Sequence, residues 1–176
     1  MNQKQKAYSL ISTLLQYPEQ EWIPLVQDLN MHEEFPDDEI RFPLQQFIRY
    51  VTNTSYDELC ENYVYTFDFY DKTTLYLTYS VFKDNRDRGP VLVELRNQMY
   101  EFGMEFTSEE LPDYLPLVLE CASIISDQDA DKLLRLHLRS IRNLYLELQG
   151  IDSPYRLLLE ACINCIEKDI ENEKVS

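Results

Sequence analysis

Residues 75–90 read LYLTYSVFKDNRDRGP, and the two halves of this stretch differ sharply in chemistry. The first half is aromatic and apolar, and its residue types alone favour a β-strand. The second half concentrates charged side chains between Lys83 and Arg88 and then reaches Gly89 and Pro90, which interrupt regular structure. Because helical periodicity flanks the stretch on both sides, we interpret its first half as a buried helix that ends at the charged turn.

Apolar residues recur at helical spacing through most of the chain, which predicts a series of amphipathic helices. Ser55 and Glu58 have the S-x-x-E spacing that is typical of a helix N-terminus. The segment MHEEFPDDEI at residues 31–40 is polar and acidic, and we expect a connection there because Pro36 discourages a continuous helix. The helices expected from these patterns cover residues 7–15, 22–29, 43–51, 56–67, 75–82, 90–102, a segment that starts at 115 or 116, 129–149 and 154–167.

Capping residues predict where several of these helices end. Asp71 is expected to be the N-cap of the helix through LYLTYSVF, and Gly103 to follow a helix end in a left-handed conformation. Gly150 is expected to close the long helix that precedes it. Ser153 and Pro154 are expected to be the N-cap and the first residue of the last helix.

Glycine is scarce, with three residues in a chain of 176. A β-rich protein needs glycine in many of its turns, so this scarcity favours long helices over hairpins. Thirteen tyrosines and eight phenylalanines supply ample apolar surface for a core. The sequence therefore predicts an all-α fold, a single-domain helical bundle of roughly eight to ten helices over residues 1–176 with no sheet. Disorder is expected from about residue 168 onward.

The net charge of −16 at pH 7 limits the classes of partner that the chain can bind. Such a charge repels phosphate backbones and anionic lipid surfaces, so we expect neither nucleic-acid binding nor direct membrane insertion. It attracts a cationic peptide or protein segment. Charge alone explains solubility equally well, so a specific partner needs further support.

The N-terminus resembles a signal peptide only weakly. Lys4 and Lys6 precede a short apolar run, AYSLISTLL, which contains hydroxyl side chains and lacks a cleavage site of small residues. No stretch approaches the ~20 apolar residues that a membrane-spanning helix needs. We therefore expect a cytoplasmic protein whose four cysteines are reduced.

A C-x-x-C motif, CINC, occurs at residues 162–165. Redox and metal sites need thiolates that are exposed at a turn or at a helix N-terminus. Cys162 and Cys165 instead share an apolar helical stripe with leucine and alanine side chains, which favours buried structural cysteines. Zinc or redox chemistry stays open as the less favoured alternative, and a metal-dependent hydrolase or oxidase would have to use this pair.

Neither of the two histidines belongs to a recognisable catalytic or metal-binding pattern. His32 begins HEEFP, which does not complete an H-E-x-x-H motif, and His137 shares an apolar stripe with leucines. The sequence contains no G-x-S-x-G, no P-loop and no G-x-G-x-x-G. We therefore expect no enzyme activity and no metal site.

Acidic residues gather in the part of the chain between Arg96 and Lys132, which contains no basic residue. They surround the apolar, proline-interrupted ELPDYLP, which combines hydrophobic anchors with negative charge and suits a basic helix or extended peptide. The alternative interpretation is that these acids have no ligand and line a face of the protein that is exposed to solvent. A basic stripe follows, and we expect it to be an intramolecular counter-surface for the acids. It consists of Lys132, Arg135, Arg139 and Arg142.

Arg86 and Arg88 flank Asp87 just before a helix start. Arginine pairs with carboxylates through two parallel hydrogen bonds, so these residues are suited to fixing the orientation of the next helix. We expect the charged corner to place that helix opposite the ELPDYLP segment.

Taken together, TFDFYDKTTLYLTYSVFKDNRDRG at residues 66–89 and ELPDYLPLVLE at residues 110–120 resemble a known family. The sequence is similar to the respiratory nitrate reductase assembly chaperones, the delta-subunit or NarJ-like proteins, within a wider family of all-helical molybdoenzyme chaperones. The order and spacing of LYLTY, R-x-R-G and ELPDYLP carry the resemblance, which covers most of the chain.

The resemblance implies a cytoplasmic, non-catalytic chaperone for the catalytic alpha subunit of respiratory nitrate reductase. Such a protein binds the N-terminal twin-arginine-like basic segment of its client. It assists insertion of molybdenum guanine dinucleotide and assembly of the enzyme complex, while no cofactor is bound permanently to the chaperone itself. A monomer or weak dimer is expected.

The resemblance also implies a set of residues that bind the peptide or shape its groove. Family members often have glycine before the aspartate of the charged turn, where this chain has Lys83, so we expect the backbone of the turn to differ. An adaptor or a chaperone for another molybdoenzyme is the alternative function. The implied residues are Phe67, Asp68, Tyr76, Tyr79, Asp84, Arg86, Arg88, Glu110, Pro112, Asp113, Tyr114 and Glu120.

Overall fold

The computed structural model describes residues 1–105 and 109–175, with side chains described through residue 168. In that part of the chain there are ten α-helices, one 3-10 turn and no strand, which confirms the predicted all-α fold. The expectation of a single domain over residues 1–176, disordered from about residue 168, involves positions outside this description and stays an expectation. The elements are α1 (Gln3–Leu14), α2 (Trp22–Gln27), α3 (Met31–Glu34), α4 (Asp38–Asn53), α5 (Tyr56–Phe67), η1 (Asp71–Thr73), α6 (Tyr79–Phe82), α7 (Arg88–Glu101), α8 (Leu115–Ile124), α9 (Asp127–Gly150) and α10 (Arg156–Val175).

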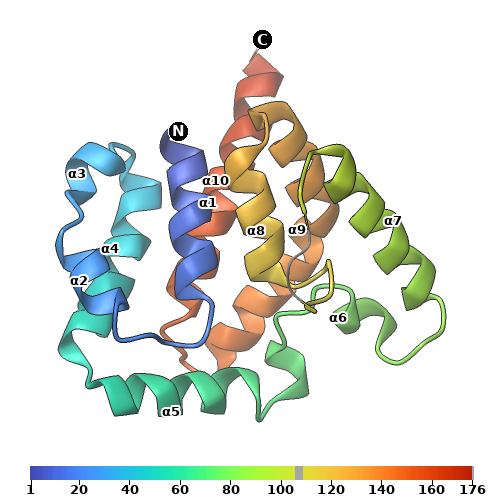
Figure 1. Cartoon of the computed structure of the whole chain (residues 1–176). Helices are drawn as coiled ribbons and strands as arrows, with labels where there is room; N and C mark the ends of the chain where they lie inside the picture. The colour runs from blue at the N-terminus through green and yellow to red at the C-terminus, as the bar shows by residue number, and fades with distance from the viewer. Residues whose placement is uncertain (106–108, 176) are drawn as a thin grey trace.

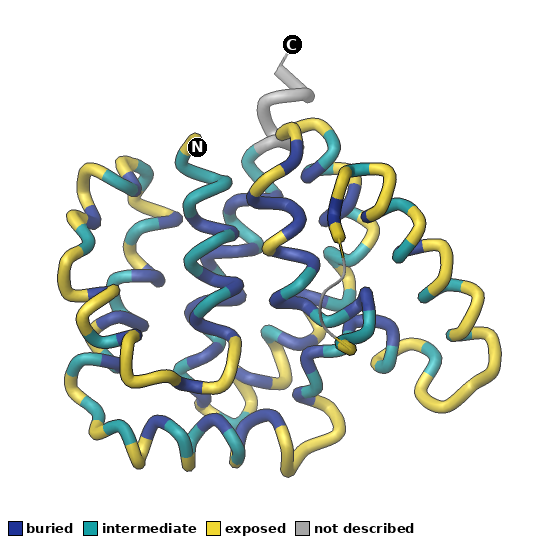
Figure 2. The backbone as a smooth tube through the Cα atoms, in the orientation of Figure 1, coloured by how far each residue is buried: buried dark blue, intermediate teal, exposed yellow. Residues whose placement is uncertain are grey.

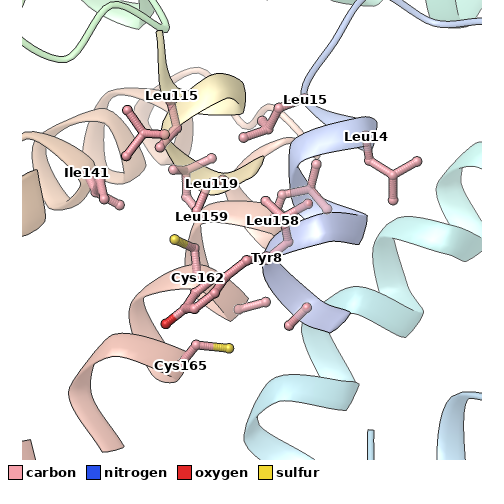
Figure 3. Packing of buried hydrophobic residues seen from close by; sticks show 14 of the residues in the cluster. Tyr8, Leu14, Leu15, Leu115, Leu119, Ile141, Leu158, Leu159, Cys162 and Cys165 are labelled. Carbon is pink, nitrogen blue, oxygen red and sulfur yellow. The ribbon is translucent and has the colours of Figure 1, made fainter. Parts of the chain in front are cut away.

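The core is built around α1, which packs most extensively against α8 and also contacts α10 (Figure 1). Side chains from these helices meet in a dry cluster, shown in Figure 3, in which Leu15, Leu119 and Leu158 are fully buried. Cys162 and Cys165 belong to the same cluster, as the apolar stripe predicted. Burial raises the pKa of the Cys162 thiol to about 12, so this thiol is neutral and inert at physiological pH.

The start of α4 differs from the prediction because a proline lies inside the helix. We expected the helix to begin near Pro43, whereas it begins at Asp38, with Asp37 accepting a capping hydrogen bond from the backbone N–H of Glu39. Pro43 leaves the carbonyl of Glu39 without its helical donor. The Asn164 side chain, from the C-x-x-C segment of α10, donates to that carbonyl at 2.8 Å. A contact between two helices thus compensates for the proline.

Two helix ends show how left-handed residues stop a helix. Gly103 follows α7 with φ +85°, as predicted, and Met104 N–H donates back to the Met99 carbonyl at 3.0 Å. After α9 the left-handed residue is Asp152, with φ +52°, whereas Gly150 is the last helical residue. The predicted helix end was therefore one residue early, and the residue that closes the helix in a left-handed conformation is Asp152, two residues after the expected Gly150.

The last helix begins later than predicted. Ser153 Oγ accepts a hydrogen bond from the Tyr155 N–H, and a turn of i to i+3 bonds precedes the first residue of α10, Arg156.

In the described part of the chain, no helix combines the length and the apolar character that crossing a membrane requires.

The segment LYLTYSVF is not the buried helix that we predicted. Asp71 begins the short turn η1 instead of capping a helix. Tyr76 takes part in an isolated β-bridge, and Leu77 and Thr78 form a turn before the next helix. Leu75 and Leu77 are buried while Tyr76 between them is partly exposed, which is the period-two alternation of a strand. Only Tyr79–Phe82 forms a helix, α6, and none of its residues is buried.

Helix α7 lies at the edge of the molecule, and its outward face is exposed to solvent (Figures 1 and 2). It begins at Arg88, two residues before the predicted start, and only Leu95 and Met99 of the helix are buried. Little of α7 is therefore buried, and its first residue, Arg88, belongs to the site described next.

Candidate functional site

The two motifs that carry the family resemblance meet in space. The Leu77 N–H donates to the Asp113 carbonyl at 3.0 Å, and the Leu115 N–H donates to the Leu75 carbonyl at 2.8 Å. These bonds flank an isolated antiparallel bridge between Tyr76 and Tyr114. The non-helical backbone from Leu75 to Leu77 is thus explained by its partner, because a segment interrupted by prolines has backbone groups available for pairing.

Three side chains form a polar joint at this bridge, namely Thr78, Arg88 and Asp113. Asp113 is fully buried, and its Oδ2 accepts from the Thr78 N–H at 2.9 Å, from the Thr78 hydroxyl and from Arg88 Nη2 at 3.1 Å. Arg88 Nε donates to Thr78 Oγ1 at 2.9 Å. The Arg88 guanidinium also lies 5.5 Å from the ring centroid of Tyr79. This ion pair confirms that the corner orients α7 against ELPDYLP, although through Arg88 and not Arg86.

Two buried polar atoms next to the joint have no hydrogen-bond partner among the described residues. They are Oδ1 of Asp113 and Nε2 of His137. Burial lowers the pKa of His137, and the negative charge of Asp113 opposes that change. His137 is therefore a boundary residue close to the joint, as its apolar stripe predicted, and neutrality of its ring is favoured by desolvation.

Beside the joint lies a groove of about 440 Å³, which we refer to as the acidic groove. Tyr63 and Tyr114 provide an aromatic wall, while Glu105, Glu110 and Glu120 supply negative charge. The groove is lined by Gln16, Tyr17, Tyr63, Met104, Glu105, Glu110, Tyr114, Pro116, Leu117 and Glu120.

Hydrogen bonding fixes part of the acidic groove in advance. The Tyr76 hydroxyl donates to Glu110 Oε2 at 2.6 Å, and the Tyr76 ring lies 5.3 Å from the ring of Tyr114. Burial and the neighbouring Glu110 together raise the pKa of Tyr76, so its hydroxyl stays a donor at any physiological pH. The carboxylate of Glu110 is thereby oriented before any ligand arrives.

A further acid acts on the aromatic wall of the groove. Asp68 is exposed at the end of α5. Burial raises the pKa values of Tyr63 and Tyr114, and the charge of Asp68 adds to that increase at both rings. Asp68 therefore lies close enough to contribute to the negative potential of the groove.

The acids of the groove are not neutralised by the basic stripe of α9. Lys132 and Arg135 pair with Asp129 and Asp131 on their own helix, and Arg142 pairs with Glu167 of α10. The predicted counter-surface thus serves only the end of the acidic run. Within the described residues, Glu105, Glu110 and Glu120 form no ion pair, so their charge is available to a cationic ligand.

The remaining residues implied by the resemblance are dispersed. Phe67 and Pro112 are buried, and Phe67 packs on Tyr155 with ring centroids 4.9 Å apart. Asp84 and Arg86 are exposed, and their side chains form no hydrogen bond or ion pair with another described side chain. Their roles in ligand binding stay predictions.

Three residues that the sequence did not single out belong to the joint or the groove. Thr78 lies inside the LYLTY motif, and its backbone N–H and its hydroxyl both donate to Asp113. Tyr17 and Tyr63 reach the groove from the α1–α2 connection and from α5. No local pattern indicates this, because only tertiary packing brings them to residues 110–120.

The charged turn before α7 has a backbone conformation at Lys83 that favours glycine. Lys83 has φ +48° and ψ −126°, and the Asn85 N–H donates to the Phe82 carbonyl at 2.9 Å. This geometry is that of a turn whose second residue is normally glycine. Lys83 thus adopts a conformation that is strained for a residue with a Cβ, and the difference that we expect from the turn of family members stays a prediction.

The structure is thus that of an all-helical protein with a groove lined by acidic and aromatic residues. A sequence model of the nitrate reductase delta subunit family matches residues 34–155, and the chain belongs to this family. The matched region contains both motifs and the polar joint that they form.

Individual relatives extend the similarity along nearly the whole chain. The probable nitrate reductase molybdenum cofactor assembly chaperone NarJ of Bacillus subtilis (strain 168) is 36% identical over 165 residues, which cover 93% of this chain and 90% of the relative. NarJ of Escherichia coli (strain K12), a nitrate reductase molybdenum cofactor assembly chaperone, is 28% identical over 171 residues, which cover 95% of this chain and 72% of the relative. The probable chaperone NarW of the same strain is 30% identical over 119 residues, which cover 68% of this chain and 50% of the relative.

Proposed function

We propose that this chain is a chaperone for the catalytic alpha subunit of respiratory nitrate reductase and binds the N-terminal, twin-arginine-like basic segment of that subunit. The acidic groove is the observation that carries this proposal, because it combines uncompensated carboxylates with an aromatic wall. The relatives are named as assembly chaperones for nitrate reductase, which supports the same client.

The chemistry of the acidic groove fits a basic, amphipathic segment. Guanidinium groups of the segment would pair with Glu110 and Glu120, and its apolar side chains would pack on Tyr63 and Tyr114. Glu110 is held in place by Tyr76, so little ordering is needed on the chaperone side. The overall charge of −16 steers a cationic segment toward the protein.

The proposed chaperone acts by binding its client. By holding the N-terminal segment, it keeps the alpha subunit competent for insertion of molybdenum guanine dinucleotide and for assembly with its partners. The chaperone binds no cofactor permanently and carries out no catalysis. It works in the cytoplasm as a monomer or weak dimer, without contacts to nucleic acid or insertion into the membrane.

Calorimetric titration with a peptide that covers the N-terminal segment of the alpha subunit tests this function. We expect binding that weakens as salt is added, because exposed ion pairs are screened. The double variant Glu110→Gln and Glu120→Gln should bind the peptide about tenfold more weakly. Glu94→Gln removes an exposed acid on α7, outside the groove lining, and serves as the matched control.

Absence of binding by the folded protein at low salt would refute the proposal. A clear preference for the corresponding peptide of another molybdoenzyme would instead change the client and support the alternative chaperone function. Equal binding by the Glu110 and Glu120 double variant and by the wild type would show that the acidic groove is not the site.

A further inference from the structure

A second hollow lies next to the acidic groove on the outer side of α5. It has a volume of about 510 Å³ and shares Tyr17 with the acidic groove. We refer to it as the aromatic hollow. Its lining residues are Tyr17, Cys60, Glu61, Asn62, Val64, Tyr65 and Phe69.

The aromatic side chains of this hollow are unusually accessible. Phe69 is 73% exposed, Tyr65 is 55% exposed and Tyr17 is 51% exposed. Large apolar side chains that gather at a hollow on a soluble protein are typical of an interaction site. Tyr65 is also held by Tyr70, with ring centroids 5.4 Å apart and hydroxyl oxygens 2.7 Å apart. The surface is therefore both apolar and ordered before binding.

Tyr17 is fixed between the two hollows by hydrogen bonds on either side of it. The Tyr63 hydroxyl donates to the Leu15 carbonyl at 3.2 Å, and the Tyr56 hydroxyl donates to the Pro18 carbonyl at 3.3 Å. The Tyr17 ring also meets the Tyr63 ring edge to face at 5.5 Å. Two tyrosines of α5 thus attach the α1–α2 connection, and Tyr17 becomes a shared wall of both hollows.

The charge around the aromatic hollow has the same sign as that of the groove. Glu61 is the charged residue of its lining, and no lysine or arginine is present in that lining. A partner that covers this surface must therefore tolerate negative charge while supplying an apolar side chain. A basic segment with an apolar residue near its cationic groups meets both conditions.

We propose that the aromatic hollow is a second subsite for the same client segment. It takes an apolar side chain, while the cationic groups of the segment bind in the acidic groove. This inference rests on the proposed function, because it assumes that the groove binds a basic segment. Since the two hollows share Tyr17, an extended chain that advances about 3.3 Å per residue passes from one to the other within a few residues.

Cys60 offers a direct test in the wild-type protein. It lines the aromatic hollow and is partly exposed, whereas Cys121, Cys162 and Cys165 are fully buried. The rate at which iodoacetamide alkylates Cys60 therefore reports whether the hollow is accessible. We expect the N-terminal client peptide to slow this reaction. A version of the peptide with its apolar residues replaced by glutamine should still bind, more weakly, but should leave the rate unchanged.

A variant of the hollow gives an independent measurement of affinity. Phe69→Ser removes the most exposed ring of the hollow, and we expect it to bind the unmodified peptide about tenfold more weakly. It should bind the glutamine-substituted peptide as tightly as the wild type does, because the hollow is then unused. Phe42→Ser, at an exposed position outside both hollows, is the matched control.

The possible outcomes separate this inference from the proposed function. If the peptide binds through the acidic groove while Phe69→Ser and the alkylation of Cys60 show no effect, the second subsite is refuted and the function stands. If the unmodified peptide does not bind at all, both fail. If Phe69→Ser changes the sedimentation of the protein alone and not its affinity for peptide, the hollow is an interface between two copies and the inference is wrong.

Discussion

The apolar core and the polar joint hold this protein together by different physical means. In the core, Leu119 and Leu158 are fully buried among other apolar side chains (Figure 3). In the joint, a fully buried carboxylate of Asp113 is satisfied by the Thr78 backbone, the Thr78 hydroxyl and the Arg88 guanidinium. Apolar burial is non-directional and tolerates substitution, whereas the joint depends on charge and on angles.

This difference between the core and the joint shows which of the two regions determines the geometry of the candidate site. Any well-packed set of leucines would bury the same area of α8, α1 and α10. The joint fixes where α7 starts relative to ELPDYLP, and the bridge between Tyr76 and Tyr114 places Tyr76 against Glu110. The core supplies stability, and the joint supplies the geometry of the groove.

Breaking the joint should have the largest effect on stability. Asp113→Ala removes the carboxylate that pairs with the partly buried Arg88 and leaves Arg88 Nη2 and the Thr78 N–H without an acceptor, so we expect a loss of about 3–5 kcal/mol in the free energy of unfolding. Urea unfolding followed by circular dichroism measures the loss. Asp84→Asn, at an exposed acid, should change the value by less than about 0.5 kcal/mol. A loss of under about 1 kcal/mol for Asp113→Ala would show that the joint is dispensable.

A cavity in the core should cost less than the broken joint, and shape should matter more than chemistry there. Leu119→Ala is expected to lose about 3 kcal/mol, whereas Leu119→Met, which conserves volume, should lose less than about 1.5 kcal/mol. Asp113→Asn also conserves shape, yet it should cost more than Leu119→Met because it removes the charge that Arg88 needs. The same urea experiment compares the three variants. Equal tolerance of both conservative changes would remove the distinction between core and joint.

The pH dependence of stability should sharpen the contrast, because His137 lies at the boundary of the two regions. Burial lowers the pKa of His137 in the folded chain below its ordinary value of about 6.5, so the unfolded chain binds a proton more readily. The stability that neutral His137 contributes is therefore present above about pH 6.5 and is lost as the pH falls through the folded pKa. We expect His137→Gln to flatten the decline in unfolding free energy between about pH 7 and about pH 5. An identical decline in both proteins would contradict this assignment.

The smallest expected effect comes from the strained turn that precedes the joint. Lys83 has φ +48°, a conformation in which a Cβ is unfavourable, so Lys83→Gly should stabilise the protein by about 0.5–1 kcal/mol. Asp84→Gly changes the neighbouring position of the turn, whose φ is not positive, and should give no gain. Thermal unfolding of the two variants measures the difference. A loss of stability in Lys83→Gly would show that the lysine side chain stabilises the protein by more than the backbone strain destabilises it.

Much of the fold could be predicted from local patterns. The stripes of α1, α5 and α9 have the period of a helix, and their apolar faces bury residues such as Ile11, Leu59 and Leu134. The helix predicted at LYLTY is wrong because helical flanks do not determine the backbone between them. The burial of Leu75 and Leu77 on either side of the partly exposed Tyr76 is an alternation that indicates a strand-like segment. That alternation has meaning only with a partner segment, and the partner lies near Asp113, far along the chain.

The candidate site was predicted less completely than the fold. The acids Glu110 and Glu120 and the ring of Tyr114 were expected at the groove, and the structure brings them together. The far wall, formed by Tyr17 and Tyr63, depends on how α5 and the α1–α2 connection pack against α8. Contacts between residues that are far apart in the chain do not affect the spacing of residue types within one segment, so a single sequence does not reveal them.

The polar joint also has a consequence for how this chain tolerates changes in length. The chain leaves the body after Thr78, passes through α6 and α7, and returns at Asp113, to which Thr78 is hydrogen bonded. The two ends of this excursion are therefore joined by the hydrogen bond between Thr78 and Asp113. The entropic cost of closing such a loop grows only slowly with its length. Insertions in the exposed turn between α6 and α7 would leave the hydrogen bonds between Thr78 and Asp113 and the apolar core in place. The edge of this protein is thus the natural position for a grafted tag or reporter.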